Sequence, residues 1–153
     1  MNSGPASIAR AAIDDLDALA PLFDDYRTFY RRPVETEAAR AFLSDRLERD
    51  ESVVFLARDG DATALGFAQL FPQFSSLDLK RNWLLGDIYV AGGARRRGIG
   101  AALLRACEEY ARGEGANTIS LETAIGNRVA HRVYETAGWL RESAWYQYAR
   151  TLR

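Results

Sequence analysis

Apolar residues in the first third of the chain recur every three or four positions, which is the spacing of one face of an α-helix. The pattern covers residues 14–30 and 36–50, and a short strand over 7–12 comes before them. Pro21 lies inside the first helical segment, where its ring and its missing N–H predict a kink or a break. One strand and two helices are therefore expected in this part of the chain.

The pattern then changes to short runs of aliphatic and aromatic residues, which are typical of strands. Residues 52–58 and 64–72 flank an Asp-Gly-Asp sequence at 59–61, and together they predict a β-hairpin. We expect a loop over 73–82 and a further strand over 83–90.

The last third of the chain alternates helical and strand patterns. Helical spacing over 101–113 is followed by a strand over 118–124, a short helix over 127–137 and a final strand over 143–151. The strands on either side of the first of these helices are expected to be parallel, because a helical crossover joins them. The order β-αα-βββ-αβ-αβ predicts an α+β protein with a mixed α/β sheet, folded as a single domain over residues 1–153.

Composition excludes several classes of function. The formal net charge is −1, so there is no general electrostatic case for binding nucleic acid or a membrane surface. No apolar run reaches the roughly 18 residues of a membrane-spanning helix, and the first residues lack the pattern of a secretory signal. Cys107 and His131 are each the single residue of their type, so neither a disulfide framework nor a Cys/His metal site is expected. We expect a cytoplasmic protein.

The sequence RRRGIGAALL at 95–104 joins the strand at 83–90 to the next helix. Backbone N–H groups in the first turn of a helix have no partner within the helix, and the helix dipole adds partial positive charge there. Gly98 and Gly100 lack Cβ atoms, so an anion can approach this backbone closely. Three arginines precede them and add mobile positive charge. The segment therefore predicts a site for a phosphate or a diphosphate.

Two common nucleotide-binding motifs do not fit this loop. A P-loop requires Lys after its last Gly, whereas Ala101 follows Gly100 here. A Rossmann loop requires a third Gly or Ala at the position that Leu103 occupies. Taken alone, the two glycines are also compatible with a tight turn before a helix that binds nothing.

The strand LLGDIYV, the motif R-x-x-G-x-G at 95–100, the strand ISLET, Asn127 and the sequence VYETAGW together resemble the GNAT superfamily of acyl-CoA N-acetyltransferases. The motifs cover residues 83–140, and the element order agrees over nearly the whole chain. The resemblance implies a GNAT-type fold in which a bulge splays the two central parallel strands, near 83–90 and 118–124, and opens a slot. It also implies acetyl-CoA as cosubstrate, without a metal.

The same resemblance assigns residues to the cosubstrate. The CoA pyrophosphate would lie on backbone amides of the glycine loop, and the pantetheine arm would pair with the preceding strand as an added strand does. Asn127 would contact this arm, although a helix N-cap also explains an Asn at this position. The residues assigned in this way are Ile88, Tyr89, Val90, Arg95, Arg96, Arg97, Gly98, Ile99, Gly100, Ala101 and Asn127.

Acetyl transfer to an amine needs a proton acceptor for the ammonium, a donor for the oxyanion and a proton for the departing CoA thiolate. By resemblance, the backbone N–H of Val90 is the oxyanion donor. Tyr134, seven residues after Asn127, would be the catalytic residue that protonates the thiolate. Without the resemblance, Tyr134 would be interpreted as a residue that packs against the sheet.

The sequence leaves the catalytic base open. Many relatives place a carboxylate four or six residues before the Val of this strand, but Gly86 and Leu84 stand there. Asp87 is one residue away, and strand alternation directs it to the other face, as a structural anchor. Glu122 occupies the position of the base in a branch that resembles ribosomal-protein N-terminal acetyltransferases. A solvated strand residue is the alternative for Glu122, and a chain of water molecules is a third route for the proton.

The acceptor wall is expected from the early helices, as in the family that this chain resembles. Tyr26, Phe29, Tyr30 and Phe74 are the candidates for contact with the acceptor, although packing also explains such aromatic residues. Cys107 has the spacing of a core residue, so we expect direct transfer without an acetyl-enzyme.

These observations predict an acetyl-CoA-dependent N-acetyltransferase that acts on a primary amine of a small molecule or peptide. A non-catalytic acyl-CoA-binding or sensing module on the same fold is the alternative. Dimers are common in the family that the chain resembles, so a homodimer is one of the oligomeric states left open.

Overall fold

The computed structural model describes residues 4–153. Short 3-10 turns lie at Ile13–Asp15 and Gly92–Ala94. The helices and strands are, in chain order, β1 (Ser7–Arg10), α1 (Leu16–Phe29), α2 (Thr36–Glu48), β2 (Val53–Arg58), β3 (Ala64–Ser75), β4 (Lys80–Val90), α3 (Ile99–Gly113), β5 (Ile119–Leu121) and α4 (Arg128–Thr136). They form two compact units, residues 1–122 and residues 123–153.

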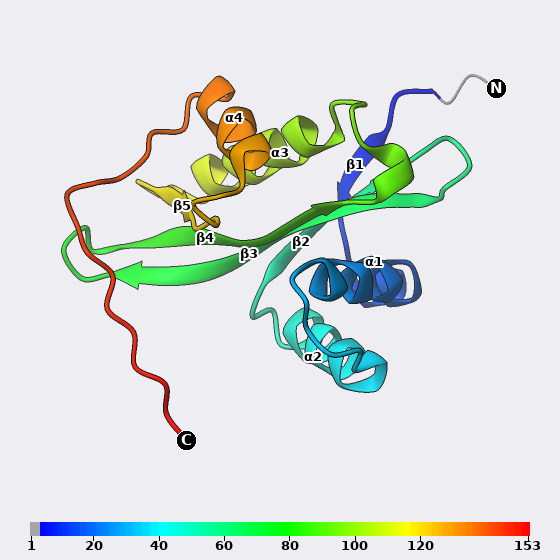
Figure 1. The fold of residues 1–153 in the computed structure, drawn as a ribbon, viewed down its shortest axis with the longest axis horizontal. Coiled ribbons are helices and arrows are strands. Elements are labelled where there is room, and N and C mark those ends of the chain that lie inside the picture. Colours follow the sequence, from blue (N-terminus) through cyan, green and yellow to red (C-terminus); the bar gives the residue numbers. More distant parts are fainter. Residues whose placement is uncertain (1–3) are drawn as a thin grey trace. The chain divides into compact units, whose positions relative to one another are not determined.

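The first unit is built on a five-stranded sheet with the order β1-β2-β3-β4-β5. Neighbouring strands are antiparallel except β4 and β5, which are parallel and are joined through α3. Helices α1 and α2 cover one face of this sheet and α3 covers the other (Figure 1). The predicted α+β class and the parallel strand–helix–strand arrangement are both confirmed.

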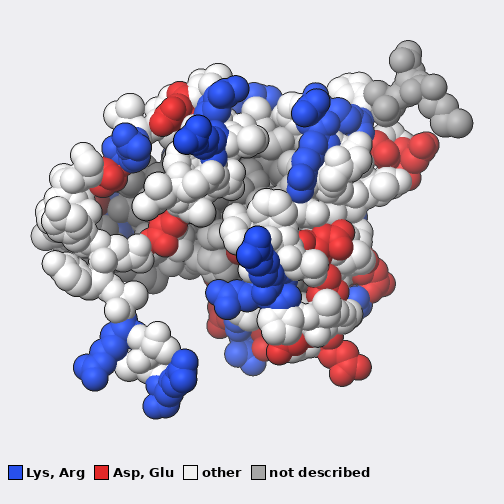
Figure 2. Space-filling model, viewed as in Figure 1, with Lys and Arg blue, Asp and Glu red and all other residues white. Residues whose placement is uncertain are grey.

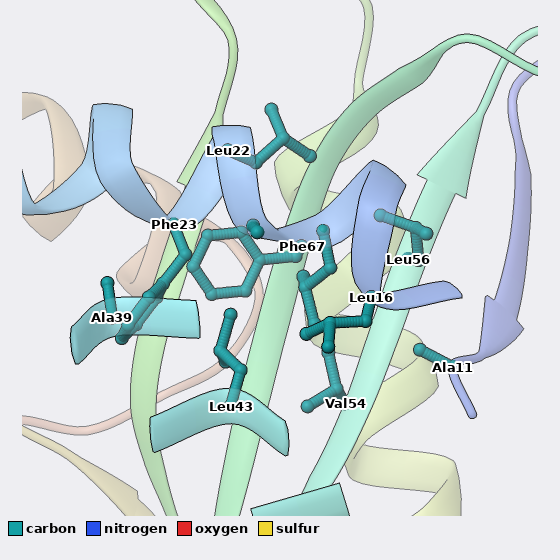
Figure 3. Close-up of a cluster of buried hydrophobic side chains, with 11 residues drawn as sticks. Ala11, Leu16, Leu22, Phe23, Ala39, Leu43, Val54, Leu56 and Phe67 are labelled. Atoms are coloured by element: carbon teal, nitrogen blue, oxygen red, sulfur yellow. The ribbon is translucent and has the colours of Figure 1, made fainter. Parts of the chain in front are cut away.

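The face under α1 and α2 carries the cluster of buried apolar side chains drawn in Figure 3. Phe23 of α1 meets Phe67 of β3 edge to face, with 6.0 Å between the ring centroids. Leu19 and Leu43 are fully buried between the two helices and the sheet. Burying a side chain of this size stabilises the fold by about 1.5–3 kcal/mol relative to leaving it in water. This packing holds α1 in a fixed place over β3 and β4.

Two predictions for the first unit need correction. The break that Pro21 would have caused is absent: helix α1 continues through this exposed residue, so water can solvate the carbonyl that the proline leaves without an N–H partner. The loop predicted over 73–82 is only a turn at 76–79, because β3 and β4 pair as far as Ser75 and Lys80.

The final predicted strand, over 143–151, is also wrong. In the second unit, α4 is followed by residues 139–153, which form neither helix nor strand. Trp145, Tyr146 and Tyr148 are 80%, 91% and 91% exposed. Alternating aromatic residues favour a strand only where neighbouring groups pack against them. Across residues 4–153, none of the helices is both long enough and apolar enough to cross a membrane.

Candidate active site

A β-bulge interrupts β4 at Gly86. Gln69 of β3 lies opposite Asp87, and Leu70 lies opposite Leu85, so Gly86 is an extra residue without a partner on β3. A Cβ atom at position 86 would lie 2.6 Å from the ring of Phe71, which leaves space only for glycine.

The bulge marks the point where β4 and β5 separate. The pairing of β5 with β4 ends at Leu85, while β4 stays paired with β3 as far as Val90. The backbone N–H of Ala91 donates to the carbonyl of Leu65 on the β3 side at 2.8 Å. Because alternate residues of a strand direct their N–H and C=O groups to opposite neighbours, those of Ile88 and Val90 point away from β3. The splay that the family resemblance implied is therefore present, with the backbone N–H groups of Ile88 and Val90 along its edge.

The glycine loop forms the start of α3. Gly98 is the N-cap residue, with a φ of +74° that side chains with a Cβ rarely adopt. No atom lies within 4 Å of the position that a Cβ of Gly98 would take. The N–H of Ala102 donates to the Gly98 carbonyl at 3.0 Å, and no side chain caps this helix. The N–H groups of the three residues between them lack an intrahelical partner, which is the arrangement that binds a phosphate.

The three arginines of this loop differ in their contacts. Arg95 folds back: its Nε donates to the Val90 carbonyl at 3.2 Å. Its guanidinium lies over the rings of Phe29 and Tyr89, at 5.6 Å and 5.8 Å from their centroids. Arg96 and Arg97 are exposed beside the glycine loop. The structure therefore places Arg95 at the end of β4 rather than over the glycines.

Tyr26, Phe29 and Tyr30 gather with Tyr89 of β4 into an aromatic wall. Tyr30 lies 5.1 Å from Tyr26 and 5.2 Å from Phe29, centroid to centroid. Tyr89 lies 6.3 Å from Tyr26 and 6.4 Å from Phe29. The wall thus brings together three of the four residues predicted to contact the acceptor.

Phe74 is not part of this wall. It lies opposite Arg81 near the β3–β4 turn, is 77% exposed and has the Arg81 guanidinium over its ring at 5.3 Å. With a rise of about 3.3 Å per strand residue, Arg81 is roughly 26 Å along β4 from Tyr89.

Asp87 faces α1, on the side of the aromatic wall. Its Oδ2 accepts a hydrogen bond from Nε2 of Gln69 at 2.7 Å, and a second hydrogen bond comes from the Tyr26 hydroxyl. Trp83, four residues earlier, packs instead on Tyr110 of α3 at 5.3 Å. The prediction that alternation turns Asp87 to the other face is wrong, because the extra residue at Gly86 reverses the alternation.

Burial is the main influence on the Asp87 carboxyl. It raises the pKa of Asp87 above its usual 3.8, and the hydrogen bonds from Gln69 and Tyr26 offset only part of that rise. Gln69 is itself fully buried, and its Oε1 accepts from the hydroxyl of Ser52 at 2.7 Å. Neither Ser52 nor Gln69 belongs to a motif that predicts a site; their one signal in the sequence is that Gln69 is a polar residue inside the apolar run 64–72.

Glu122 is exposed and follows β5 directly. The remaining predicted residues belong to the second unit. The Oδ1 of Asn127 accepts from the N–H of Ala130 at 3.2 Å, so its role as the N-cap of α4 is confirmed. Tyr134 is half-buried on α4, and its ring lies 6.1 Å from that of Trp139.

Cys107 does not have the properties of a nucleophile. It is fully buried under α3, and this burial raises the pKa of Cys107 to about 12. The thiol is therefore protonated at neutral pH and out of reach of a substrate.

The surface of α1 and α2 is rich in carboxylates, and Figure 2 shows acidic side chains gathered over these helices with basic ones among them. The acidic residues of the two helices are Asp17, Asp24, Asp25, Glu37, Asp45 and Glu48, and the basic ones are Arg27, Arg40 and Arg46. The two helices together therefore carry excess negative charge, while two exposed arginines, Arg31 and Arg32, directly follow the wall residue Tyr30.

Comparison with known proteins gives consistent matches along the chain. A sequence profile of the acetyltransferase (GNAT) family matches residues 19–139. The uncharacterized N-acetyltransferase YhfO of Bacillus subtilis is 40% identical over 142 residues, which are 93% of this chain and 95% of that protein. An aminoglycoside N(6′)-acetyltransferase type 1 of Klebsiella aerogenes is 35% identical over 101 residues, 64% of this chain and 65% of that protein. The crystal structure of a probable acetyltransferase has a TM-score of 0.92 at 42% identity, covering 96% of this chain and 98% of that one.

Proposed function

The chain belongs to the acetyltransferase (GNAT) family of enzymes, and we propose that it transfers the acetyl group of acetyl-CoA directly to a primary amine of a small molecule. One observation carries this proposal. At Gly86, β4 loses β5 as a neighbour, and the free backbone edge that follows leads directly into the glycine loop. An extended arm that ends in a diphosphate fits such an edge and such a loop.

The residues of the first unit that would hold acetyl-CoA are those whose backbone N–H groups point away from β3 or begin α3. Ile88 and Val90 would pair with the pantetheine arm, and the N–H groups of Ile99, Gly100 and Ala101 would bind the pyrophosphate. The open space over Gly98 leaves room for phosphate oxygens, which a Cβ atom would displace. Acetyl-CoA supplies the thioester carbonyl that the acceptor amine attacks.

Two features support a cationic small molecule as the acceptor. Relatives of this chain include proteins named aminoglycoside N(6′)-acetyltransferase, and aminoglycosides are polyamines. The aromatic wall presents π faces that already hold one cation, the guanidinium of Arg95, and the neighbouring helices carry excess negative charge. Aromatic faces of this kind can also bind the ammonium group of an acceptor.

For the chemistry, the family resemblance proposes one role each for Val90, Tyr134 and Glu122. The N–H of Val90 points away from β3, which supports its role as the donor to the carbonyl oxygen as charge develops there. Tyr134 is proposed to protonate the departing sulfur, and Glu122 is the base that the family resemblance proposes. The buried thiol of Cys107 supports direct transfer rather than an acetyl-enzyme.

An amine-panel assay tests the function. Release of CoA thiol would be followed with acetyl-CoA and an aminoglycoside, spermidine, lysine or a histone-tail peptide. We expect turnover of at least one polyamine substrate. If calorimetry detects tight binding of acetyl-CoA and no amine in the panel is acetylated, the alternative of an acyl-CoA sensor replaces this proposal.

A further inference from the structure

A buried chain of polar side chains crosses β3 behind the aromatic wall. Ser52 donates from Oγ to Oε1 of Gln69 at 2.7 Å, and Nε2 of Gln69 donates to Oδ2 of Asp87 at 2.7 Å. Ser52 is 3% exposed and Gln69 is fully buried. Burying such groups is unfavourable unless they are hydrogen-bonded, so their presence in an apolar strand calls for an explanation beyond packing.

The hydrogen bonds that join Ser52, Gln69 and Asp87 can run in only one direction. An ionised carboxylate can only accept hydrogen bonds, so the side of the Gln69 carboxamide that faces Asp87 must be its N–H₂ group. The carbonyl side then faces Ser52, whose hydroxyl can donate to it. Ser52 therefore stabilises this rotation of Gln69 by donating to its carbonyl, and Gln69 holds one oxygen of Asp87.

The bulge at Gly86 carries this carboxylate to the acceptor side. Asp87 faces α1, where the Tyr26 hydroxyl bonds to it and also lies 3.5 Å from the Gly86 carbonyl. Tyr26 is itself part of the aromatic wall, with ring contacts to Tyr30 and Tyr89. Asp87 is thus a carboxylate that is anchored from behind by Gln69 and lies beside the surface proposed to receive a cationic amine.

We propose that Asp87 is a catalytic residue that receives the ammonium of the acceptor and takes its proton, and that Gln69 and Ser52 are the positioning residues that hold it. The inference rests on the proposed acetyl transfer. The proton leaves the ammonium nitrogen for a carboxylate oxygen of Asp87. The nitrogen keeps its electron pair for attack, and Asp87 becomes a neutral acid. Asp87 then returns the proton to solvent after the acetyl group has been transferred.

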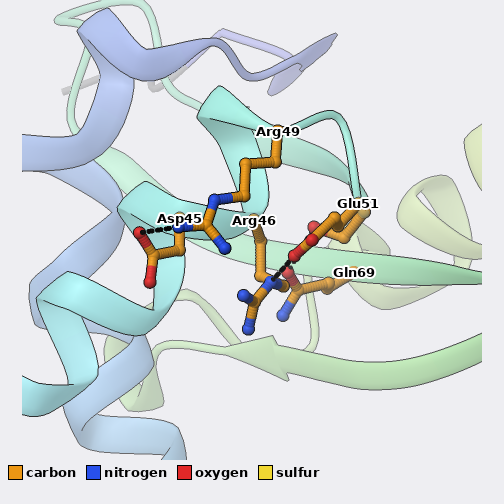
Figure 4. Close-up of polar contacts among 6 residues, drawn as sticks. Asp45, Arg46, Arg49, Glu51 and Gln69 are labelled. Atoms are coloured by element: carbon orange, nitrogen blue, oxygen red, sulfur yellow. Dashed lines mark hydrogen bonds and ion pairs between the residues drawn. The ribbon is translucent and has the colours of Figure 1, made fainter.

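The surroundings of Asp87 are suited to this role. On the side of the aromatic wall, the titratable groups near Asp87 are the phenols of Tyr26, Tyr30 and Tyr89. The charged group on this side is the guanidinium of Arg95, which lies over the ring of Tyr89. On the Ser52 side, Arg46 of α2 is paired with Glu51 at 2.5 Å, as drawn with Gln69 in Figure 4. Burial makes the proton affinity of Asp87 higher than that of a solvated carboxyl, which improves it as a base near neutral pH.

The test compares the pH dependence of kcat/KM in four proteins, with the amine found in the panel assay. Asp87→Asn should lower kcat/KM by roughly 100-fold or more and remove the acidic limb of the profile. Gln69→Met removes the donor that favours the charged carboxylate, so the acidic limb should move up by about one pH unit. Ser52→Ala should move the limb in the same direction by less, because the carboxamide remains.

Two controls separate this role from a structural one. Asp45→Asn is the matched change at an exposed carboxylate of α2, 3.9 Å from Arg49, and its profile should equal that of the wild type. Thermal melting and acetyl-CoA binding, measured on every variant, establish that each protein is folded and binds the cosubstrate. A Gln69→Met protein that loses activity without any movement of the limb would reject Gln69 as a positioning residue.

Each remaining outcome decides between the proposals. If the wild type is active and Asp87→Asn keeps its activity and its acidic limb, Asp87 is not the base. If Glu122→Gln removes the limb instead, the base is Glu122. If the wild type acetylates no amine at all while it binds acetyl-CoA, the proposed function fails, and the role of Asp87 fails with it.

Discussion

Asp87 lies directly opposite Gln69 on the neighbouring strand, and the Gln69 carboxamide donates to its carboxylate at 2.7 Å. The pair sits two residues from the end of the regular β4–β5 pairing, on the strand edge proposed to bind acetyl-CoA. A largely buried carboxylate beside a proposed substrate surface should affect both stability and activity. Replacing Asp87 with asparagine should raise the stability of the fold at neutral pH and lower the activity.

The stability effect follows from the raised pKa of Asp87. Below 3.8 the carboxyl is neutral in both states, whereas between 3.8 and the higher native pKa the native state binds the proton more tightly. The free energy of unfolding contributed by Asp87 therefore falls as pH rises through that window. Asp87→Asn should gain in Tm relative to the wild type as pH rises from about 3 to 7. A Tm difference that stays constant with pH would contradict the raised pKa, and Asp45→Asn, as a control, should show no such gain.

Gly98 gives a prediction about binding. Its φ of +74° strains any residue with a Cβ, and a valine side chain would fill the open space proposed for the pyrophosphate. Gly98→Val should weaken acetyl-CoA binding by at least 100-fold in calorimetry. Gly113→Ala is the matched control, because Gly113 is the last residue of α3 and has no atom within 4 Å of its Cβ position. That variant should bind normally and be no less stable than the wild type. Unchanged affinity in Gly98→Val would reject the glycine loop as the phosphate site.

The sequence predicted the parallel β4–α3–β5 arrangement because helical and strand periodicities alternate clearly there and glycines mark the start of the helix. It did not predict which way Asp87 points. Trp83, Leu85, Asp87 and Tyr89 alternate without interruption in the sequence, so nothing local shows that an extra residue at Gly86 reverses the faces. The resemblance predicted a bulge, but the position of the bulge decides the direction of every later side chain.

The predicted last strand fails for a related reason. Residues 143–151 have the aromatic alternation of a strand, yet a strand is stable only when other groups pair with its backbone. Phe74 was placed wrongly at the acceptor wall for the same reason. Its distance from the wall is set by the β3–β4 register, which no local sequence pattern encodes. Pairing between distant segments decides these features.

Cys107 distinguishes direct transfer from a two-step mechanism. Its thiol is fully buried and has its pKa raised to about 12, so it should resist iodoacetamide at pH 8 in the native protein and react once the protein is unfolded in urea. Cys107→Ala should keep kcat close to that of the wild type, with stability lowered by about 1 kcal/mol for the small cavity. Covalent labelling by acetyl-CoA that disappears in Cys107→Ala would instead establish an acetyl-enzyme.

Tyr134 is the proposed acid for the departing thiolate, and Tyr134→Phe tests that role with little structural change. The ring, half-buried and 6.1 Å from that of Trp139, is retained in phenylalanine, and thermal melting establishes that the variant is folded. Loss of the phenolic proton should lower kcat by roughly 100-fold and leave the KM for acetyl-CoA nearly unchanged, because the proton is needed only as the sulfur departs. Tyr146→Phe is the matched control, since Tyr146 is 91% exposed in the segment after α4. If kcat is the same in Tyr134→Phe and in the control, the thiolate takes its proton from solvent and Tyr134 serves only in packing.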